Sequence, residues 1–483
     1  MTEVKGATDP ARSRAAPSRP PALLVLGPVV AFGLLLLGLS RNAGTGITDP
    51  DTPWHVLAGR HLWDTWQFHG PDPYSMFTRG PWVLNQWLPE LVMAGADRVG
   101  GLAAVAWLAQ LARLAVCVLL YAACRRRAGS LPAAFVAGAA VLGTADSLSP
   151  RPQLVGFALL VLTVDAWLRT ASDLRPRWWL VPVAYLWACS HGTWVVGVTV
   201  GVAVVVGLLL DRRVRLRDGQ LLRLAAVPVA SGLVALVTPV GPSLLTSFSA
   251  VRAVSPYIQE WRVPTTPTPS VLVTAALLLL VPLVWVLRRR QVAWTRVVLW
   301  LLAVAWGASS MRTVAVGAII AAPLAAEALA TLLGRERNRV ERGERVVVGA
   351  SILAAVALSG LLAAAGPSTP AGVPHAFDPR LRAMPAGTVV YNTDLLGGWL
   401  MYSHPGLVHT ADTRAELYGP VLVRSYLDVM AARPGWEQDL DHFAPRAAIL
   451  EKGLPVVDAL RSRGWQVLGE DAGYVLLEPG TPR

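Results

Sequence analysis

The segment LAAVAWLAQLARLAVCVLLYAACRRR, from Leu102 to Arg127, is a run of mostly apolar residues that ends in three arginines. Its apolar part, Leu102 to Cys124, is long enough to cross a bilayer, which takes about 20 helical residues. Because the bilayer core offers no water to backbone N–H and C=O groups, such a run can only span as a helix. The arginines that follow are expected in the cytoplasm, where basic residues of membrane proteins are enriched.

Similar runs recur along the chain, and the composition agrees with them. Of the 483 residues, 54% are hydrophobic and 15% are charged, and the mean hydropathy is +0.47, which lies outside the usual balance of a soluble domain. We predict a polytopic α-helical membrane protein with about eleven spans. They cover residues 22–40, 102–123, 131–147, 152–170, 179–191, 193–210, 224–240, 270–287, 292–309, 313–333 and 346–365.

The net charge of +12 does not point to a nucleic-acid partner, because the basic residues cluster between apolar runs. Charges in such places fix the orientation of the spans. An even number of spans separates the strongest clusters, so all can lie inside together. These clusters are Arg125 to Arg127, Arg175 with Arg177, Arg212 to Arg223, Arg288 to Arg290, and Arg335 to Arg345. The three cysteines have neither metal-ligand spacing nor the pattern of a disulfide framework.

This topology divides the chain into three parts. Residues 1–21 are polar and predicted to be a disordered cytoplasmic tail, and residues 22–365 form the membrane domain. Residues 366–483 form a domain outside the cytoplasm, and residues 41–101 form a large first outer loop. Polar chemistry is therefore expected on the outer face.

The first outer loop opens with two acids, Asp49 and Asp51, on either side of Pro50 and shortly before His55. Carboxylates at a membrane surface can remove a proton from a hydroxyl, or hold a divalent cation against a phosphate. Asp49 could instead cap the helix predicted over residues 53–66. The proximity of Asp51 to His55, one helical turn away, favours a function for the pair.

Further polar residues fall on the same face. Arg151 and Gln153 lie at the outer end of the fourth span, where an arginine can bind a phosphate or anchor the helix at the interface. His191 stands among tryptophans and is either structural or functional. Glu260 and Arg312 could line a cavity for a phosphate-linked sugar, although a surface salt bridge is the alternative for Glu260.

Arg113 is predicted near the middle of the second span, where a charge is expensive and faces a partner or a watery cavity. A structural partner such as Asp146 and a role with substrate are both open.

The C-terminal region alternates between short strands and helices, which indicates a small α/β domain. It lacks a glycine-rich dinucleotide loop. The strands are predicted over 388–391, 407–409, 447–450, 465–468 and 474–477, and the helices over 395–402, 420–432 and 454–463. Charges concentrate in the segment from Asp412 to Tyr418. They could form a ligand site, or they could form a structural Arg–Glu pair.

Taken together, an acidic pair after the first span, amphipathic helices in the first outer loop, many spans and an outer C-terminal domain resemble the GT-C class of membrane glycosyltransferases. Short motifs also resemble those of a large bacterial group of GT-C-like proteins. They are Asp51 to Gly59, Asp72-Pro73-Tyr74-Ser75, Trp87-Leu88-Pro89-Glu90, Arg151-Pro152-Gln153, Ser190-His191-Gly192, Thr238-Pro239-Val240-Gly241 and Gly397-Gly398-Trp399-Leu400.

The resemblance implies a multi-pass protein of the bacterial inner membrane that takes a sugar from a polyprenyl-phosphate carrier and gives it to a lipid, glycan or protein. Asp49 or Asp51 would be the base, and Arg151 and Arg312 would stabilise the leaving phosphate. The resemblance does not decide which of the two is the base. Pro50 separates the acids here, whereas better-known members carry an adjacent Asp-Glu or a single Asp. The remaining candidates for substrate binding are His55, Gln153, His191 and Glu260, with a divalent metal ion as an option.

Two other functions stay open. A transporter or flippase for lipid-linked glycans would use Arg113 to line its path, although no paired inverted repeat is evident. A cell-envelope scaffold without catalysis would use only the outer domain.

Overall fold

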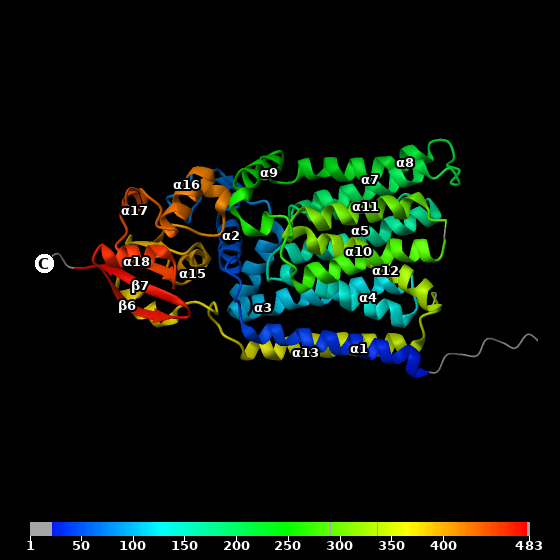
Figure 1. Cartoon of the computed structure of the whole chain (residues 1–483), viewed down its shortest axis with the longest axis horizontal. Coiled ribbons are helices and arrows are strands. Elements are labelled where there is room, and N and C mark those ends of the chain that lie inside the picture. Colours follow the sequence, from blue (N-terminus) through cyan, green and yellow to red (C-terminus); the bar gives the residue numbers. More distant parts are fainter. Residues whose placement is uncertain (1–21, 290, 336, 481–483) are drawn as a thin grey trace, which may run out of the picture.

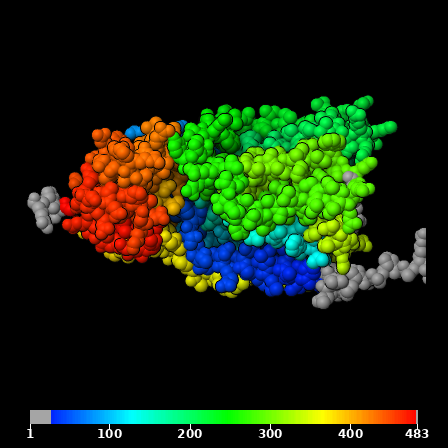
Figure 2. Space-filling view, in the orientation of Figure 1, coloured from blue at the N-terminus to red at the C-terminus, as the bar shows by residue number. Residues whose placement is uncertain are grey.

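The structure, a computed structural model, describes residues 22–289, 291–335 and 337–480. A bundle of long helices carries a smaller domain with a β-sheet at one end (Figure 1). Figure 2 shows this C-terminal domain covering that end of the bundle. The predicted cytoplasmic tail, residues 1–21, lies outside the described residues.

A helix lies over each of the predicted spans. These helices are α1 (Ala22–Ser40), α3 (Trp87–Arg125), α4 (Ser130–Gly143), α5 (Gln153–Asp173), α6 (Leu180–Ala188), α7 (Trp194–Leu210), α8 (Gln220–Leu233), α10 (Pro269–Leu287), α11 (Trp294–Ser309), α12 (Val314–Leu333) and α13 (Arg342–Ala365). Within the described ranges, seven helices are long and apolar enough to cross a membrane. The chain is a multi-pass membrane protein, and the number of eleven crossings stays a prediction.

The first outer loop contains α2 (Thr52–Thr65), where an amphipathic helix was predicted. A second amphipathic stretch of the loop, residues 82–96, is also expected to be helical from the sequence, but its helix begins only at Trp87. Trp82 and Val83 instead form strand β2 (Trp82–Val83), which pairs with β1 (His69–Gly70). From Trp87 the helix runs into the second span as the single kinked element α3. The kink falls at Gly100 and Gly101, where Gly101 has a φ of +61° that glycine adopts readily.

The arginine-rich connections gather at the end of the bundle opposite the C-terminal domain (Figure 1). The Gly129 N–H donates to the Arg335 carbonyl over 3.1 Å, and the Arg288 guanidinium donates to the Leu332 carbonyl over 3.0 Å. The connection after α5 meets the one after α7, because the Gln220 side chain donates to the Leu174 carbonyl. The common side expected for these clusters is therefore present in the fold.

The C-terminal domain is built on a five-stranded sheet in the order β4-β3-β5-β7-β6. Its strands are β3 (Val389–Asn392), β4 (Val408–His409), β5 (Ala447–Glu451), β6 (Trp465–Asp471) and β7 (Tyr474–Pro479). Strand β3 is parallel to β4 and β5, whereas β7 is antiparallel to β5 and β6. The predicted α/β character is confirmed.

Helices cover both faces of this sheet. Alternate strand residues point to opposite sides, and both sides carry apolar residues that need cover. Tyr391 and Leu450 belong to one apolar cluster, and Val390 and Ile449 belong to another. The helices are α14 (Asp378–Ala383), α15 (Gly397–Ser403), α16 (Ala415–Met430), α17 (Trp436–Phe443) and α18 (Pro455–Ser462). The short helices α14 and α17 were not predicted from the sequence.

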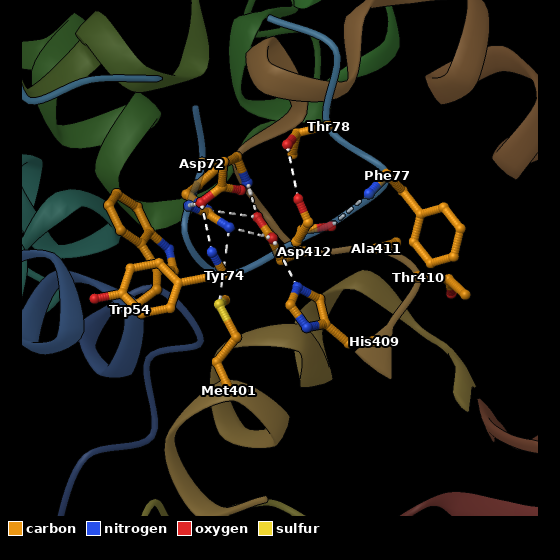
Figure 3. A network of polar contacts seen from close by, with 12 residues as sticks. Trp54, Asp72, Tyr74, Phe77, Thr78, Met401, His409, Thr410, Ala411 and Asp412 are labelled. Carbon is orange, nitrogen blue, oxygen red and sulfur yellow. Dashed lines mark hydrogen bonds and ion pairs between the residues drawn. The ribbon is translucent and has the colours of Figure 1, made fainter. Parts of the chain in front are cut away.

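A buried charge cluster fastens the C-terminal domain to the first outer loop (Figure 3). The Arg414 guanidinium donates to both oxygens of Asp412, over 2.9 and 2.7 Å, and to Oδ1 of Asp72 over 3.0 Å. Tyr418 Oη donates to the same Asp412 carboxylate over 2.7 Å. Arg414 thus pairs with aspartates, one of them in another part of the chain, and the alternative of an Arg–Glu pair within residues 412–418 is wrong.

The position of Asp412 makes this cluster sensitive to acid. Burial by itself would raise the pKa of Asp412, but the charge and hydrogen bonds of Arg414 and His409 outweigh it and hold the pKa well below its usual range. A carboxyl whose pKa is depressed by folding contributes stability above its unfolded pKa and loses it as the pH falls toward the folded pKa.

We predict that the C-terminal domain lies outside the cytoplasm and that the connection from Arg212 to Arg223 lies inside. Alkaline phosphatase, which is active only outside the cytoplasm, should be active when fused after residue 480 and inactive when fused after residue 223. The opposite pattern would reverse the orientation.

We also predict that Asp412→Asn lowers the free energy of unfolding at pH 7 by about 3 to 5 kcal/mol, because Arg414 loses a buried partner. The difference from wild type should shrink as the pH falls below about 4, because the Asp412 carboxyl then takes up a proton in the unfolded chain but not in the folded protein, which lowers the stability of wild type. Thermal melting in detergent measures it, with Asp458→Asn as the control because Asp458 is 85% exposed. A difference that stays constant with pH would contradict the assignment.

Candidate functional site

Four connections meet between the bundle and the C-terminal domain. The Thr52 hydroxyl at the start of α2 donates to the Pro150 carbonyl over 2.9 Å, which ties the first outer loop to the start of α5. The Met311 N–H donates to the Arg262 carbonyl over 2.9 Å, which joins the loops before α10 and α12. They enclose a cavity of about 380 Å³, lined by Asp49, Asp146, Ser147, Ser149, Arg151, Gln153, Glu260, Met311 and Arg312.

Arg151 holds the two predicted acids at this cavity. Its Nε donates to Asp49 Oδ2 over 2.8 Å, and its Nη1 lies 2.9 Å from Asp51 Oδ2. The three side chains are largely buried, with exposed fractions of 16%, 6% and 13% for Arg151, Asp49 and Asp51. The forked guanidinium suits this arrangement because it can meet two carboxylates at once.

Asp49 connects the start of α2 to Arg151 through its two carboxylate oxygens. Oδ1 accepts the backbone N–H groups of Asp51 and Thr52, over 3.0 and 3.2 Å, at the start of α2. Oδ2 accepts from Arg151. Burial and the negative charge of Asp51 raise the pKa of Asp49, and Arg151 counteracts only part of this rise. Asp49 is therefore both a helix-start residue and part of the charged site.

Asp51 differs from Asp49 in one respect. Its Oδ2 is paired with Arg151, whereas its Oδ1 is buried and has no hydrogen-bond partner among the residues that the structure describes. Buried carboxylate oxygens are normally hydrogen-bonded, so an unpartnered one needs an explanation. Asp51 is the acid with capacity to accept a proton or a hydrogen bond.

Glu260 and Arg312 complete the charged rim of the cavity. Glu260, in the short helix η5 (Gln259–Trp261), lies 3.7 Å from Arg151 Nη1 and 3.5 Å from Arg312 Nη1. Arg312, in η6 (Met311–Thr313), also stacks over the Trp261 ring at 5.5 Å. These ion pairs are long compared with those of Asp49 and Asp51. The rim can therefore rearrange around an anion more easily than the centre.

His191 lies beside the site as a neutral side chain. It is held against α5 at Gly156, where a Cβ would lie 3.6 Å from the His191 Cβ and 2.6 Å from the Thr193 hydroxyl. Burial, followed by the positive charges of Arg312, His55 and Arg151, lowers the pKa of His191 well below its usual value. Its Nδ1 accepts the Thr193 N–H over 3.2 Å, which assigns the proton to Nε2.

The other two candidates, Gln153 and His55, differ in their position relative to the cavity. The Gln153 amide donates to the Ser147 carbonyl over 2.7 Å, so it orders a loop that lines the cavity. His55 does not line the cavity, because it is buried one turn below Asp51 with its Nδ1 2.8 Å from Glu90 Oε1. Within the described ranges, no group of three or more His, Cys, Asp or Glu side chains is placed to hold a metal ion. A metal requirement stays a prediction.

Two acids of this region were not recognised in the sequence. Glu90 belongs to the Trp87-Leu88-Pro89-Glu90 motif, and only the buried partner His55 shows why the motif carries an acid. Glu416 comes from α16 of the C-terminal domain. Burial raises the pKa of Glu416, and the charges of Asp412 and Asp51 raise it further against the opposing effect of Arg414. The C-terminal domain therefore brings a further acidic side chain near Asp51.

The suggested pairing of Arg113 with Asp146 is wrong. Arg113 donates to the Leu148 carbonyl over 2.6 Å and to the Gln110 side chain over 3.3 Å. Asp146 instead accepts the hydroxyls of Thr268 and Ser270 at the start of α10. Arg113 can meet a carbonyl because the loop after α4 ends the run of intrahelical hydrogen bonds.

The same arrangement of helices occurs in solved structures. The oligosaccharyltransferase of Archaeoglobus fulgidus, in its apo form, superposes with a TM-score of 0.55 over 89% of this chain and 70% of that one, at 12% identity. ArnT from Cupriavidus metallidurans, in the apo state, gives a TM-score of 0.51 over 96% of this chain and 100% of ArnT, at 15% identity. Both are GT-C glycosyltransferases.

This chain has the GT-C-like fold. The likeness covers both the bundle and the C-terminal domain, since 96% of the chain aligns with ArnT. No protein-family profile matches the sequence, and no curated protein matches it either. The GT-C resemblance of the sequence motifs is thus confirmed at the level of fold.

Among the arginines of the site, Arg151 should contribute most to the stability of the folded protein. We predict that Arg151→Ala lowers the free energy of unfolding by roughly 3 kcal/mol, because two buried carboxylates lose their counter-charge. Arg151→Lys should recover only part of the loss, since an ammonium lacks the fork. Melting temperatures of the purified variants measure this, with Arg262→Ala as the control because Arg262 is exposed. Equal melting temperatures for the Arg151→Ala and Arg262→Ala proteins would contradict the central position of Arg151.

Proposed function

We propose that this protein transfers a sugar from a polyprenyl-phosphate carrier to a hydroxyl of a lipid, glycan or protein on the outer face of the membrane. The observation that carries the proposal is the state of Asp51, whose Oδ2 is held by Arg151 while its buried Oδ1 lacks a partner in the part of the chain that the structure describes. A fixed carboxylate with one unengaged oxygen suits a general base. The GT-C-like fold around it supports the same class of reaction.

In this reaction Asp51 Oδ1 accepts the proton of the acceptor hydroxyl as the hydroxyl oxygen bonds to the anomeric carbon of the sugar. The bond from that carbon to the phosphate oxygen breaks, and the electron pair leaves with the polyprenyl phosphate. Asp49 is less suited to the role, because Arg151 and two backbone N–H groups already engage both of its oxygens. Its part is to hold Arg151 and the start of α2 in place.

The leaving phosphate needs positive charge, and the rim of the cavity supplies it. Arg312 and Arg151 share Glu260 through ion pairs of 3.5 and 3.7 Å. A phosphate can displace the Glu260 carboxylate, whose side chain is 50% exposed, and take bidentate contacts from the arginines. Donors of this kind stabilise charge that develops on a leaving group.

The size of the cavity agrees with the proposed donor. Its volume of about 380 Å³ lies in the range of small-molecule sites, roughly 300 to 1,000 Å³. The carrier chain is apolar and would remain in the bilayer, so only the sugar phosphate must enter the cavity. Whether a divalent cation joins the phosphate there is part of the proposal that metal removal can test.

The transport alternative loses the residue on which it depended. Arg113, in the interior of α3, donates to the Leu148 carbonyl and to the Gln110 side chain, which is a structural use of its charge. A scaffold without catalysis would not need Asp51 to keep an unpartnered buried oxygen, which costs about 1 to 3 kcal/mol.

Asp51→Asn should therefore reduce sugar transfer by about a hundredfold to ten-thousandfold, because the amide has the size of the acid but cannot act as a base. The assay uses purified protein in vesicles with a panel of polyprenyl-phosphate sugars, and mass spectrometry detects the product. Asp64→Asn is the matched control, since Asp64 is a 67% exposed acid of the same helix. It should keep full activity.

Asp49→Asn should lose less activity than Asp51→Asn, because Asn still accepts backbone N–H groups at the start of a helix. The reverse order would exchange the roles of the two acids. Full transfer by the Asp51→Asn protein, with normal folding, would remove the proposed mechanism.

A further inference from the structure

The C-terminal domain touches the acidic segment itself. Gly398, the second residue of α15, packs against the carbonyl of Pro50, the residue between Asp49 and Asp51. A Cβ at Gly398 would overlap the Pro50 oxygen and lie 3.7 Å from the Pro53 Cβ. Neither Gly398 nor its neighbour Gly397 has a positive φ, so close approach is the reason for the glycine.

A hydrogen bond holds the next turn of the same loop. The Trp54 indole donates to the Thr413 hydroxyl over 3.1 Å. Trp54 follows Asp51 by three residues, and its ring stacks on His55 with centroids 3.6 Å apart. The guanidinium of Arg414 lies over two rings of this region, 5.8 Å from the Trp54 centroid and 6.0 Å from the Tyr74 centroid.

The remaining contacts grip the loop farther from the acids. Arg414 holds Asp72 through the hydrogen bond of 3.0 Å described above. The N–H groups of Arg79 and Gly80 both donate to the Leu417 carbonyl over 2.8 Å. On the opposite side, Tyr402 of α15 donates to Asp97 over 2.8 Å. The domain is therefore attached along most of the first outer loop.

Two of these contacts lie next to the acids in the chain, because Gly398 packs against Pro50 and Thr413 binds Trp54. Pro50 connects Asp49 to Asp51, so a shift of its carbonyl moves both carboxylates relative to Arg151. Arg151 stands two residues before α5, and the neighbouring Pro150 carbonyl accepts the Thr52 hydroxyl of the loop. The membrane bundle thus holds the arginine and one side of the acidic segment, and the C-terminal domain holds the other side, at Pro50 and Trp54.

We propose that the C-terminal domain positions Asp49 and Asp51 for sugar transfer, with Gly398 and Thr413 as positioning residues that act through Pro50 and Trp54. The inference rests on the proposed function, since it assigns the domain a task in that reaction. The domain then works without supplying the base. A misplacement of about 1 Å in a reacting group can cost about a hundredfold in rate.

The test compares Gly398→Ala with Gly406→Ala in the full-length protein. A Cβ at Gly406 meets no atom within 4 Å among the described residues, so this control adds the same methyl group to the same domain without a clash. Hydrogen exchange of the amides of Asp51 and Thr52 reports the position of Asp49, because both donate to its Oδ1. Transfer from a polyprenyl-phosphate sugar reports the reaction.

We expect Gly398→Ala to speed exchange at these two amides roughly tenfold, the effect of weakening their hydrogen bonds. Turnover should fall about a hundredfold, with little change in the KM for the donor, because Arg312 and its surroundings are not displaced. Gly406→Ala should match wild type in all three. Exchange that stays at the wild-type rate in Gly398→Ala would overturn the inference, whatever the activity.

Two further results keep the proposals separate. If Gly398→Ala does not fold, Thr413→Val removes only the hydroxyl that binds Trp54 and should show the same pattern with a smaller amplitude; wild-type exchange and turnover in that protein would overturn the inference. If wild type transfers no sugar from any donor but Gly398→Ala still speeds exchange, the positioning contact is supported and the proposed function fails.

Discussion

Two carboxylates, Asp49 and Asp51, approach a single guanidinium, and the arrangement of the whole outer end follows from this contact. Acids this close repel each other, and burial adds to the cost of their charge. Arg151 offsets part of both effects with contacts of 2.8 and 2.9 Å. The start of α5 must therefore lie under the first outer loop. The Thr52 bond to Pro150 and the loops that carry Glu260 and Arg312 enclose the same point.

A second buried arginine repeats this principle in the C-terminal domain. Arg414 joins Asp412 of its own domain to Asp72 of the first outer loop, and it does so with almost no exposure, at 3%. Loss of one member of such a buried pair strongly destabilises the folded protein, because the other charge is left without a partner. The two arginines together hold the loop from both sides, one from the membrane bundle and one from the domain. This double attachment gives a loop of polar and aromatic residues the rigidity that a reacting centre needs.

Much of the fold could be predicted from the sequence because the bilayer allows few solutions. Apolar runs gave the positions of the helices, and the arginine clusters gave their common end. Strand patterns gave all five strands of the C-terminal sheet. The later start of α3 could not be predicted, because the pairing of Trp82 and Val83 with β1 depends on a partner strand of two residues. The kink at Gly100 and Gly101 also depends on backbone angles that no apolar pattern encodes.

The candidate site was predicted as a set of residue types on one face, and its internal pairing was not. Nothing in local sequence shows that Arg151 meets acids about a hundred positions earlier, or that Arg113 meets a carbonyl instead of Asp146. The central claim, that these acids serve sugar transfer, is tested most directly by comparing envelope glycolipids of a deletion strain by mass spectrometry. The account predicts a glycan lacking one sugar, restored by wild type but not by the Asp49→Asn, Asp51→Asn double variant. Unchanged glycans in the deletion strain, or full restoration by the double variant, would contradict it.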